Sequence, residues 1–375
     1  MVASGSDTIQ YPSGSEVLPN HWVNRTHGTA GSGLNWQAIA SDRSGAHLIA
    51  SVFGGDLWTS SNSGASWTNR TTGTAATGKL WYSVASNADA SLLVASEVQD
   101  VWTSVDFGQT WVNRTTGTSA SGAPWFSVAS DASGVHLVGA TQGRDVWTSH
   151  DSGATWVNRT TGSSATNENW QSVASDSTGT NLIAAGKDLW VSHDSGATWS
   201  NRTAGTEASG QNWTSVASDA AGATLMAVAL AGDIWISTNA GTTWLNRTTG
   251  TPESGNSWTS IATNTAGTRF IAASERYAGG PPGSKGDLWT SADVGTTWVE
   301  RLGGGIAQRV WVSAASDASG TQLVAADDTG DLWTYRSDTT TTSLLVGQPG
   351  AFVRLLYIGG GMFIVADAFG PLAAY

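Results

Sequence analysis

The residues best suited to bind a ligand or to catalyse a reaction gather in the C-terminal third of the chain. The planar guanidinium of arginine suits carboxylate, sulfate or phosphate groups, and a tyrosine ring can stack on a ligand. Two carboxylates that face each other across a cleft could act as a glycosidase pair. The candidate ligand-binding residues are Glu275, Arg276, Tyr277, Arg309, Trp311, Asp327, Asp328 and Arg354. The sequence identifies no catalytic residue, no metal ligand and no cofactor.

Tryptophan marks an internal repeat that must position these residues. All 21 tryptophans fall into three columns of seven, with a period of about 45 residues that is typical of propellers and solenoids. The first column opens the motif W-x-S-V-A-S-D: Trp36, Trp81, Trp125, Trp170, Trp213, Trp258 and Trp311. The second lies in D-[LVI]-W-[TVI]: Trp58, Trp102, Trp147, Trp190, Trp235, Trp289 and Trp333. The third ends S-x-[DN]-x-G-x-[TS]-W or its remnant: Trp22, Trp67, Trp111, Trp156, Trp199, Trp244 and Trp298.

Each repeat divides into four short strands separated by turn residues. In the repeat that begins at Trp125, these are WFSVASD, HLVGAT, DVWTS and TWVNRT. The alternation of side chains, the β-branched and aromatic residues, and the Gly, Ser and Asp punctuation favour strands over helices. Four antiparallel strands in a repeat of this length predict one blade of a β-propeller, with the first strand at the axis and the fourth at the rim.

The two chain ends predict eight blades. Residues 352–375 align with residues 311–335 as an eighth copy that stops after its third strand. The missing fourth strand is available at 21–26 (HWVNRT), which has no blade before it. Pairing of these two segments would remove an exposed sheet edge. We therefore predict an all-β, eight-bladed propeller, and the alternative is seven blades with a C-terminal cap.

The predicted domain organisation follows from the repeat. A repeat fold grows by adding units, so the 375 residues are interpreted as one β-propeller domain over 21–375, preceded by a flexible leader over 1–20. The first residues are polar and lack the apolar core of a secretory signal. The compartment is left open, with an extracellular location as one alternative.

The turn between the third and fourth strands resembles the Asp box, or BNR repeat. Six good copies are present, among them SVDFGQTW, SHDSGATW and SADVGTTW. The Asp box is found in the propellers of sialidases and of photosystem II assembly factors, so the resemblance implies a propeller. It implies no single activity, because Asp boxes occur in enzymes and binding proteins alike. The F-R-I-P-like arginine motif of sialidases is missing, which argues against that enzyme class.

Several repeated columns look chemical but are predicted to be structural. The Asp or Asn of each Asp box can accept backbone N–H bonds within its turn, and one carboxylate per turn is too few for calcium. An aspartate that starts each third strand is expected to pair with an arginine near the end of the fourth. The six N-R-T sequons and the histidines repeat with the strands, so we interpret them as copies of the repeat.

Function is expected where the repeat symmetry breaks. The largest departure is the insertion SERYAGGPPGSKG at 274–286, which is either a lid or tolerated decoration. Arg309 replaces a small polar residue, and Arg354 stands where other repeats carry serine. With Arg276, these arginines could approach one opening over blades 6 to 8. The alternative is that a degenerate closing blade drifted and that its charges are solvated or paired.

Composition excludes several classes of function. The net charge of -12 argues against a nucleic-acid partner, and no apolar run approaches the roughly 20 residues of a membrane span. Cysteine is absent, so no disulfide or thiolate metal site can form. The predicted function is a non-catalytic, lectin-like propeller that binds carbohydrate or another polar ligand near blades 6 to 8. The alternatives are a glycan- or small-molecule-processing enzyme that uses the same face, and a protein-interaction scaffold; the oligomeric state is left open.

Overall fold

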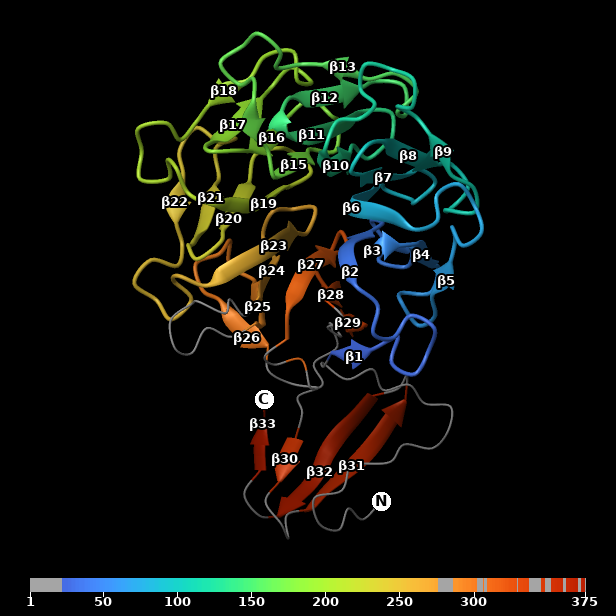
Figure 1. The fold of residues 1–375 in the computed structure, drawn as a ribbon. Coiled ribbons are helices and arrows are strands. Elements are labelled where there is room, and N and C mark those ends of the chain that lie inside the picture. The colour runs from blue at the N-terminus through green and yellow to red at the C-terminus, as the bar shows by residue number, and fades with distance from the viewer. Residues whose placement is uncertain are drawn as a thin grey trace. The chain divides into compact units, whose positions relative to one another are not determined.

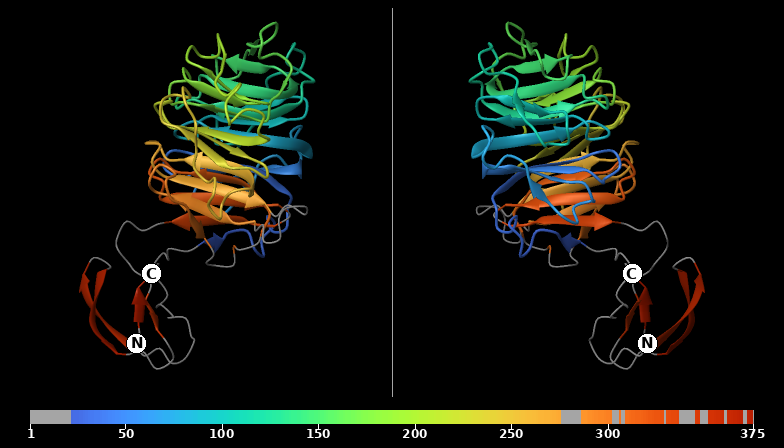
Figure 2. Two further views of the ribbon diagram at one scale, coloured as in Figure 1. Left: turned by 90° about the vertical axis from the view of Figure 1, so that its left-hand side faces the viewer. Right: turned by 90° about the vertical axis from the view of Figure 1, so that its right-hand side faces the viewer.

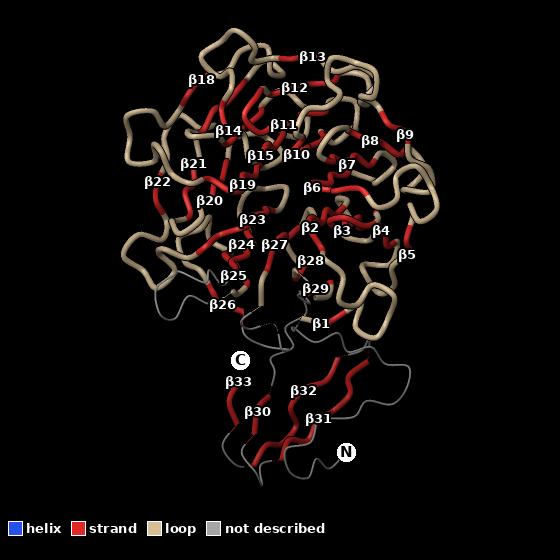
Figure 3. The backbone as a smooth tube through the Cα atoms, viewed as in Figure 1, coloured by secondary structure: helices blue, strands red, loops and turns tan. Residues whose placement is uncertain are grey.

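Strands form all the regular secondary structure in the described part of the chain (Figure 3). The structure is a computed structural model that describes residues 22–275, 286–301, 306, 309–328 and 330–336, and the backbone of four later strands. It divides the chain into two compact units, one of His21–Arg336 and the other of Met1–Asn20 and Ser337–Tyr375. The predicted flexible leader, 1–20, lies outside the described residues, and the assignment of 21–375 to one domain stays a prediction.

The larger unit consists of seven sets of four antiparallel strands around a common centre (Figure 1). We number these blades 1 to 7 in chain order. The innermost strands are β2 (Trp36–Ser41), β6 (Lys79–Ser86), β10 (Trp125–Ser130), β15 (Ser172–Ser175), β19 (Trp213–Ser218), β23 (Ser257–Thr263) and β27 (Trp311–Ser316). The second strands are β3 (Leu48–Gly55), β7 (Leu93–Glu97), β11 (Leu137–Arg144), β16 (Leu182–Ala185), β20 (Leu225–Ala229), β24 (Phe270–Glu275) and β28 (Gln322–Asp327).

The outer half of each blade follows the same order. The third strands are β4 (Leu57–Ser60), β8 (Val101–Ser104), β12 (Val146–Ser149), β17 (Leu189–Ser192), β21 (Ile234–Ser237), β25 (Leu288–Ser291) and β29 (Leu332–Arg336). The outermost strands are β5 (Thr68–Asn69), β9 (Val112–Asn113), β13 (Val157–Asn158), β18 (Ser200–Asn201), β22 (Leu245–Asn246), β26 (Val299–Arg301) and β1 (Val23–Asn24). A short extra strand, β14 (Glu168–Asn169), pairs with β11. In side view the strands run between two faces that carry the loops (Figure 2). We call the face at which the innermost strands begin the upper face, and the face at which they end the lower face.

A circuit of backbone hydrogen bonds closes the ring at the lower face. In each blade, an N–H just after the innermost strand donates to the carbonyl at the same position in the next blade, at 2.9–3.1 Å. The donors are, in order, Arg43, Ala88, Ala132, Ser177, Ala220, Thr265 and Ala318. Ala318 of blade 7 donates to the carbonyl of Arg43 in blade 1. Because this last bond returns to the start, the described ring closes with seven blades.

A second circuit joins the innermost strands through serine hydroxyl groups. Each hydroxyl accepts the N–H of a residue in the next innermost strand at 3.0–3.3 Å. The pairs are Ser83 with Val128, Ser127 with Val173, Ser172 with Val216, Ser215 with Ile261, Ser260 with Ala314, and Ser313 with Ile39. Blade 1 carries Ala38 at this position, so this circuit is interrupted between blades 1 and 2.

The N-terminal strand closes blade 7, which corrects the predicted pairing with the C-terminal segment. Val23 and Asn24 of β1 lie opposite Thr334 and Trp333 of β29. The side chains explain this choice, because Nδ2 of Asn24 donates to Oδ2 of Asp331 at 2.8 Å, and blades 1 to 5 have an equivalent contact. The N-terminal strand therefore completes a blade as its fourth strand, as predicted, but that blade is the seventh and its partner is β29.

The C-terminal segment forms strands of its own. Its strands are β30 (Leu345–Gly347), β31 (Phe352–Gly359), β32 (Met362–Phe369) and β33 (Leu372–Ala374), and they pair as β31 with β32 and β30 with β33. The predicted eighth copy thus contains an antiparallel pair of strands, but none of these strands pairs with β1. The predicted eighth blade is absent from the described ring.

Tryptophan supplies the largest side chains of the core. The tryptophans that begin the innermost strands are at most 1% exposed, and those of the third strands are nearly as buried. Seven hydrophobic clusters lie between neighbouring blades. Each contains one tryptophan of the first column and one of the second. Burial of a ring this large stabilises the folded state by several kcal/mol at about 25 cal/mol per Å². The core therefore accounts for these two columns.

The aspartates of the third strands bind the end of the fourth strand, but not through arginine. In blade 2, Asp100 accepts hydrogen bonds from Asn113, Thr115 and Thr116 at 2.7–3.0 Å. Arg114 instead donates from Nε to the hydroxyl of Thr103 at 2.6 Å. The predicted Asp–Arg pair is wrong, because amide and hydroxyl groups already satisfy the carboxylate. The asparagines of the N-R-T sequons have a structural role, as predicted.

Candidate functional site

Three predicted ligand-binding residues cannot be placed at one site. Arg276 and Tyr277 lie outside the described residues. Arg354 belongs to β31, where it lies opposite Asp367 of β32, in the C-terminal unit. The convergence of Arg276, Arg309 and Arg354 therefore stays a prediction.

Arg309 is bound to Asp327 at the upper face of blade 7. Its Nη1 donates to Oδ2 of Asp327 at 2.6 Å, and its guanidinium lies 4.6 Å from the ring centroid of Trp333. The side chain of Asp327 is 7% exposed, against 31% for Arg309. Burial raises the pKa of Asp327, and the hydrogen bond and charge of Arg309 oppose this effect. Both predicted ligand contacts are thus partners of each other.

Lys79 and Glu97 repeat this arrangement in blade 2. Both cations stand two residues before the first tryptophan of their blade, and both acids stand at the same position of the second strand. Nζ of Lys79 lies 3.9 Å from Oε1 of Glu97 and 5.7 Å from the ring centroid of Trp102. Burial also raises the pKa of Glu97. Because the same arrangement of cation, acid and tryptophan occurs in two blades, we interpret Arg309 and Asp327 as a structural ion pair.

Trp311 is buried, which corrects the expectation that it contacts a ligand. Its ring is 0% exposed and lies 6.3 Å from Trp22 and 6.4 Å from Trp333, measured between centroids. It packs in the cluster between blades 6 and 7. The ring is therefore not available to stack on a ligand at the upper face.

Glu275 and Asp328 occupy one repeat position, at the upper ends of the second strands of blades 6 and 7. Burial raises the pKa of Glu275, and the charge of Asp328 raises it further. The backbone N–H of Asp328 donates to the carbonyl of Val310 at 2.8 Å. Its Oδ1 is buried and has no hydrogen-bond partner among the described residues. Both carboxylates can accept hydrogen bonds from a ligand, and a protonated Glu275 can also donate one.

A second group of side chains lies at the upper ends of the innermost strands of blades 1 to 4. The residue after the first tryptophan is partly exposed in each of these blades. The rings of Tyr82 and Phe126 stack, with centroids 4.4 Å apart and an interplanar angle of 19°. We call the four residues the aromatic arc: Gln37, Tyr82, Phe126 and Gln171.

A β-bulge determines how the rings of the arc are presented. The register between β6 and β7 shifts between Trp81 and Ser83, which leaves Tyr82 without a residue opposite it. The same shift between Trp125 and Ser127 leaves Phe126 unpaired in blade 3. A bulge inserts one residue and re-aims its side chain. The tryptophan can therefore stay in the core while the next residue is partly exposed.

The surroundings of the arc are apolar on one side and polar at both ends. Phe53 meets Tyr82 edge to face, with centroids 5.5 Å apart, and Leu80 lies opposite Phe53 with 43% of its surface exposed. The amide groups of Gln37 and Gln171 form no hydrogen bond with the described residues. In blades 5 and 6, by contrast, the threonine hydroxyls at this position donate to the carbonyls of the next innermost strand at 2.7 Å.

The columns of residues that repeat in every blade do not reveal the aromatic arc. The signal was a column that does not repeat: the residue after the first tryptophan is Gln, Tyr, Phe, Gln, Thr, Thr and Val in blades 1 to 7. Two adjacent aromatic residues in neighbouring blades could have been recognised as an asymmetric feature. Their stacking could not, since it depends on the distance between the strands.

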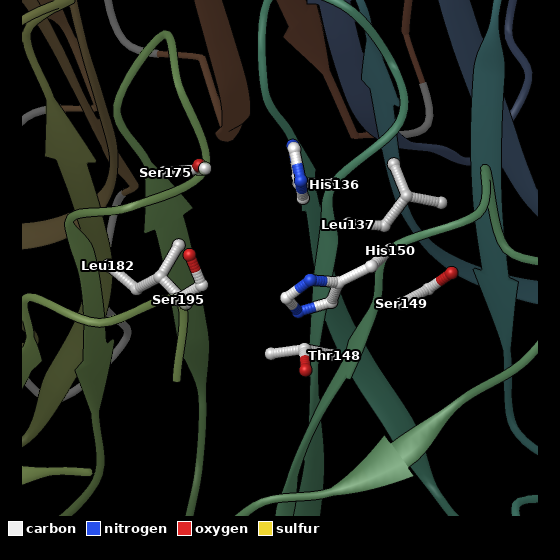
Figure 4. Close-up of a pocket in the computed structure, with 9 residues that line it drawn as sticks. His136, Leu137, Thr148, Ser149, His150, Ser175, Leu182 and Ser195 are labelled. Carbon is white, nitrogen blue, oxygen red and sulfur yellow. The ribbon is translucent and has the colours of Figure 1, made fainter. Parts of the chain in front are cut away.

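A pocket on the lower face between blades 3 and 4 holds two histidines (Figure 4). Nδ1 of His136 lies 2.9 Å from Oδ2 of Asp131, and the same pair recurs in blade 1, which agrees with the prediction of repeat copies. The ring of His150 lies edge-on to His136, and its Nε2 is 3.3 Å from Nη2 of Arg159. Burial lowers the pKa of His150, and the charges of Arg159 and His136 add to this effect. One ring nitrogen of each histidine therefore already has a polar partner, Asp131 for His136 and Arg159 for His150.

The described residues contain no group of three or more histidine, aspartate or glutamate side chains arranged to hold a metal ion. No helix in them is long and apolar enough to cross a membrane.

Known proteins share the fold of this chain but not its sequence. No protein-family model and no curated protein sequence matches it. The GH74 xyloglucanase from Xanthomonas campestris has a TM-score of 0.65 at 16% identity, covering 85% of this chain and 54% of that one. The GH74 enzyme of Niastella koreensis has a TM-score of 0.64 at 16% identity, with coverages of 94% and 60%. The chain thus spans little more than half the length of these two proteins.

A shorter protein matches over nearly its whole length. YCF48 bound to D1 peptide has a TM-score of 0.61 at 14% identity, and the match covers 85% of this chain and 97% of YCF48. At such identities the similarity shows the fold alone. The chain is an all-β protein with a β-propeller fold.

Proposed function

We propose that this chain is a non-catalytic β-propeller that binds carbohydrate at its upper face through the aromatic arc. The observation that carries the proposal is the stacked pair of Tyr82 and Phe126, flanked by the unbonded amides of Gln37 and Gln171. Binding sites for small polar ligands combine aromatic surface with a few polar groups that fix orientation. A pyranose presents both an apolar C–H face and hydroxyl groups, so it suits this combination.

The proposed surface differs from the one that the sequence suggested. Of the candidates over blades 6 to 8, Arg309 and Asp327 bind each other and Trp311 is buried. The arc in blades 1 to 4 is partly exposed and its amides are free of described partners. Glu275 and Asp328 remain as hydrogen-bond acceptors in blades 6 and 7, and blade 7 adjoins blade 1 in the ring.

An enzyme of glycan chemistry is the second candidate. It is favoured by the raised pKa of Glu275, which burial and the charge of Asp328 cause. An acid whose pKa is raised by burial, beside a second carboxylate, resembles the acid and base pair of a glycosidase. Similarity in fold to a xyloglucanase supports a glycan as the ligand in either case. The peptide bound to YCF48 supports the third candidate, a protein-interaction scaffold.

Thermal unfolding in the presence of a broad panel of soluble glycans tests the proposal. A ligand that binds the folded state raises its melting temperature, in proportion to the logarithm of concentration over Kd. We expect at least one glycan to stabilise the wild type but not the Tyr82→Ala/Phe126→Ala variant. Phe107→Ala is the matched control, because Phe107 is an aromatic residue of the lower face that is 44% exposed.

Release of new reducing ends from the stabilising glycan distinguishes binding from catalysis. We expect none from the wild type. Turnover that Glu275→Gln abolishes would instead establish the enzyme, and stabilisation by no glycan would leave the scaffold as the remaining candidate.

A further inference from the structure

We infer that the glycan bound by the aromatic arc is neutral, and that it stacks on Phe126 beside Gln171. This inference rests on the proposed carbohydrate function and specifies its ligand class. It follows from which aromatic face is free, from the chemistry of the arc, and from the state of the charged groups around it.

The ring contacts occupy one face of Phe126, whose side chain is partly exposed. Tyr82 covers one face of Phe126, and Phe53 meets Tyr82 at an interplanar angle of 77°. The second face of Phe126 has no aromatic partner among the described residues. Gln171 stands at the same position in the next blade, on the side away from Tyr82. A sugar ring on Phe126 would therefore lie next to the Gln171 amide.

The polar groups of the arc are uncharged. The amide side chains of Gln37 and Gln171 each offer two N–H donors and one carbonyl acceptor. Vicinal hydroxyl groups of a sugar match such a donor and acceptor pair. Neutral donors and acceptors give no particular advantage to a carboxylate or sulfate group.

The cations nearest to the arc along the chain have partners. Lys79 stands three residues before Tyr82, and it pairs with the buried Glu97 and lies over Trp102. An acidic sugar would have to draw Lys79 away from Glu97, and an unpaired buried carboxylate is costly. The same cost would apply to Arg309, which is bound to Asp327.

Cations at the upper ends of blades 3 and 4 have a carboxylate between them. Arg144 lies opposite Glu168 in the pair of β11 and β14. The backbone N–H of Lys187 donates to Oε2 of the same glutamate at 3.3 Å. Glu168 therefore lies close to the backbone of both exposed residues, and its negative charge partly offsets their attraction for an anionic ligand.

The wider field of the protein also opposes an acidic glycan. The net charge is -12, and Asp328 with Glu275 adds acidic groups to the upper face of blades 6 and 7. Such repulsion acts over a Debye length of about 10 Å in dilute salt. A polyuronate or a sulfated glycan would meet it on approach, and a neutral glycan would not.

Titration calorimetry of the full chain tests the inference. The ligands are neutral hexasaccharides (cello-, manno- and xylohexaose) and oligogalacturonate of the same length, each in low and high salt. We expect a neutral hexasaccharide to bind with an affinity that salt leaves unchanged, and oligogalacturonate to bind at least about tenfold more weakly in low salt. We expect Phe126→Ala to weaken the neutral ligand at least about tenfold, and Gln171→Lys to increase the affinity for oligogalacturonate.

Additional variants separate a loss of binding from a loss of folding. Phe126→Leu keeps an apolar side chain but removes the aromatic face, so it should lose affinity while it keeps the wild-type melting temperature. Phe107→Ala on the lower face should bind as the wild type does. If oligogalacturonate binds more tightly than every neutral hexasaccharide, the inference fails while the proposed function stands. If no saccharide binds at all, the proposed function fails, and this inference fails with it.

Discussion

At the residue scale, the chemistry of the upper face depends on which polar groups already have partners. Arg309 looks like a ligand-binding cation in the sequence, yet it lies beside a buried carboxylate and over a tryptophan, as Lys79 does in blade 2. Gln37 and Gln171 attract no notice in the sequence, yet their amides have no described partner. A charged residue in a repeat protein is therefore weak evidence for a binding site when the adjacent strand of the same blade carries a residue of opposite charge.

Glu97 gives a pH-dependent prediction at this scale. Burial raises its pKa above the usual 4.5, so the folded state holds the proton more tightly than the unfolded state. Its contribution to stability is present below pH 4.5 and is lost as pH rises through the raised pKa. Relative to the wild type, Glu97→Gln should therefore become more stable as pH increases over this interval, and the difference should then level off.

Chemical denaturation of both proteins across the acid to neutral range measures this difference. Lys79→Met is a useful companion, since removal of the cation should raise the pKa of Glu97 further and widen the interval. A difference between Glu97→Gln and the wild type that shrinks with increasing pH would contradict the assignment.

The candidate site was only partly predictable from residues. The sequence places Arg309 and Asp327 in one predicted ligand-binding site, but it does not predict that they form an ion pair with each other. The comparison of blades 2 and 7 could have revealed this, because Lys79 and Glu97 occupy the same two columns. The stacking of Tyr82 on Phe126 was out of reach, because nothing in one strand reports the distance to the next.

At the element scale, the aspartate that begins the third strand binds the end of the fourth strand in blades 1 to 5 and in blade 7. In blade 2, burial acts to raise the pKa of Asp100, but hydrogen bonds from Asn113 and from Thr115 and Thr116 outweigh it and lower that pKa. The same balance lowers the pKa values of equivalent residues: Asp56, Asp145, Asp188 and Asp331. These carboxylates therefore favour the folded state when they are ionised.

The blade aspartates predict loss of stability in acid. A group with a lowered pKa contributes stability above its usual value of 3.8, and this is lost as pH falls through the folded pKa. We expect Asp100→Asn to lower the free energy of unfolding at neutral pH by about 1 to 3 kcal/mol. The loss should shrink as pH falls from 3.8 through the lowered pKa, because the carboxylate of the folded wild type then takes up a proton. Equal losses at both pH values would exclude an electrostatic origin.

The serine circuit between the innermost strands leads to a stabilising substitution. Blade 1 interrupts the circuit with Ala38, which is 9% exposed. Ala38→Ser would place a hydroxyl where the N–H of Val84 can donate to it, as Val128 donates to Ser83. We expect a gain of about 1 kcal/mol in the free energy of unfolding.

The opposite substitution provides the control for the circuit. Ser313→Ala removes the bond to the N–H of Ile39, so it should lower stability by a similar amount. Differential scanning calorimetry of both variants measures the two effects. If Ala38→Ser destabilises the protein as much as Ser313→Ala does, the serine bonds do not explain the stability of the ring.

At the scale of the whole molecule, the sequence predicts the class of fold better than the size of the ring. The repeat length and the strand pattern suffice for a β-propeller, since each unit must pack on the next. The blade count depends on which copy accepts the N-terminal strand. Asp331 begins β29 as the equivalent aspartates begin the other third strands, so blade 7 can bind Asn24. The eighth copy has no tryptophan, and it carries Pro371 at the position of Asp331, so it has no carboxylate there for Asn24.

Ring closure by β1 and β29 predicts that the C-terminal segment is dispensable for the propeller. A chain that ends at Arg336 keeps both hydrogen-bond circuits and the contacts of Asn24 and Asp331. It should unfold cooperatively at nearly the melting temperature of the full chain. Trp22→Ala should instead destabilise either chain by about 3 to 5 kcal/mol, because Trp22 is 3% exposed and packs at the closing seam. An unfolded truncated chain beside a stable Trp22→Ala variant would mean that the C-terminal strands, and not β1, complete the ring.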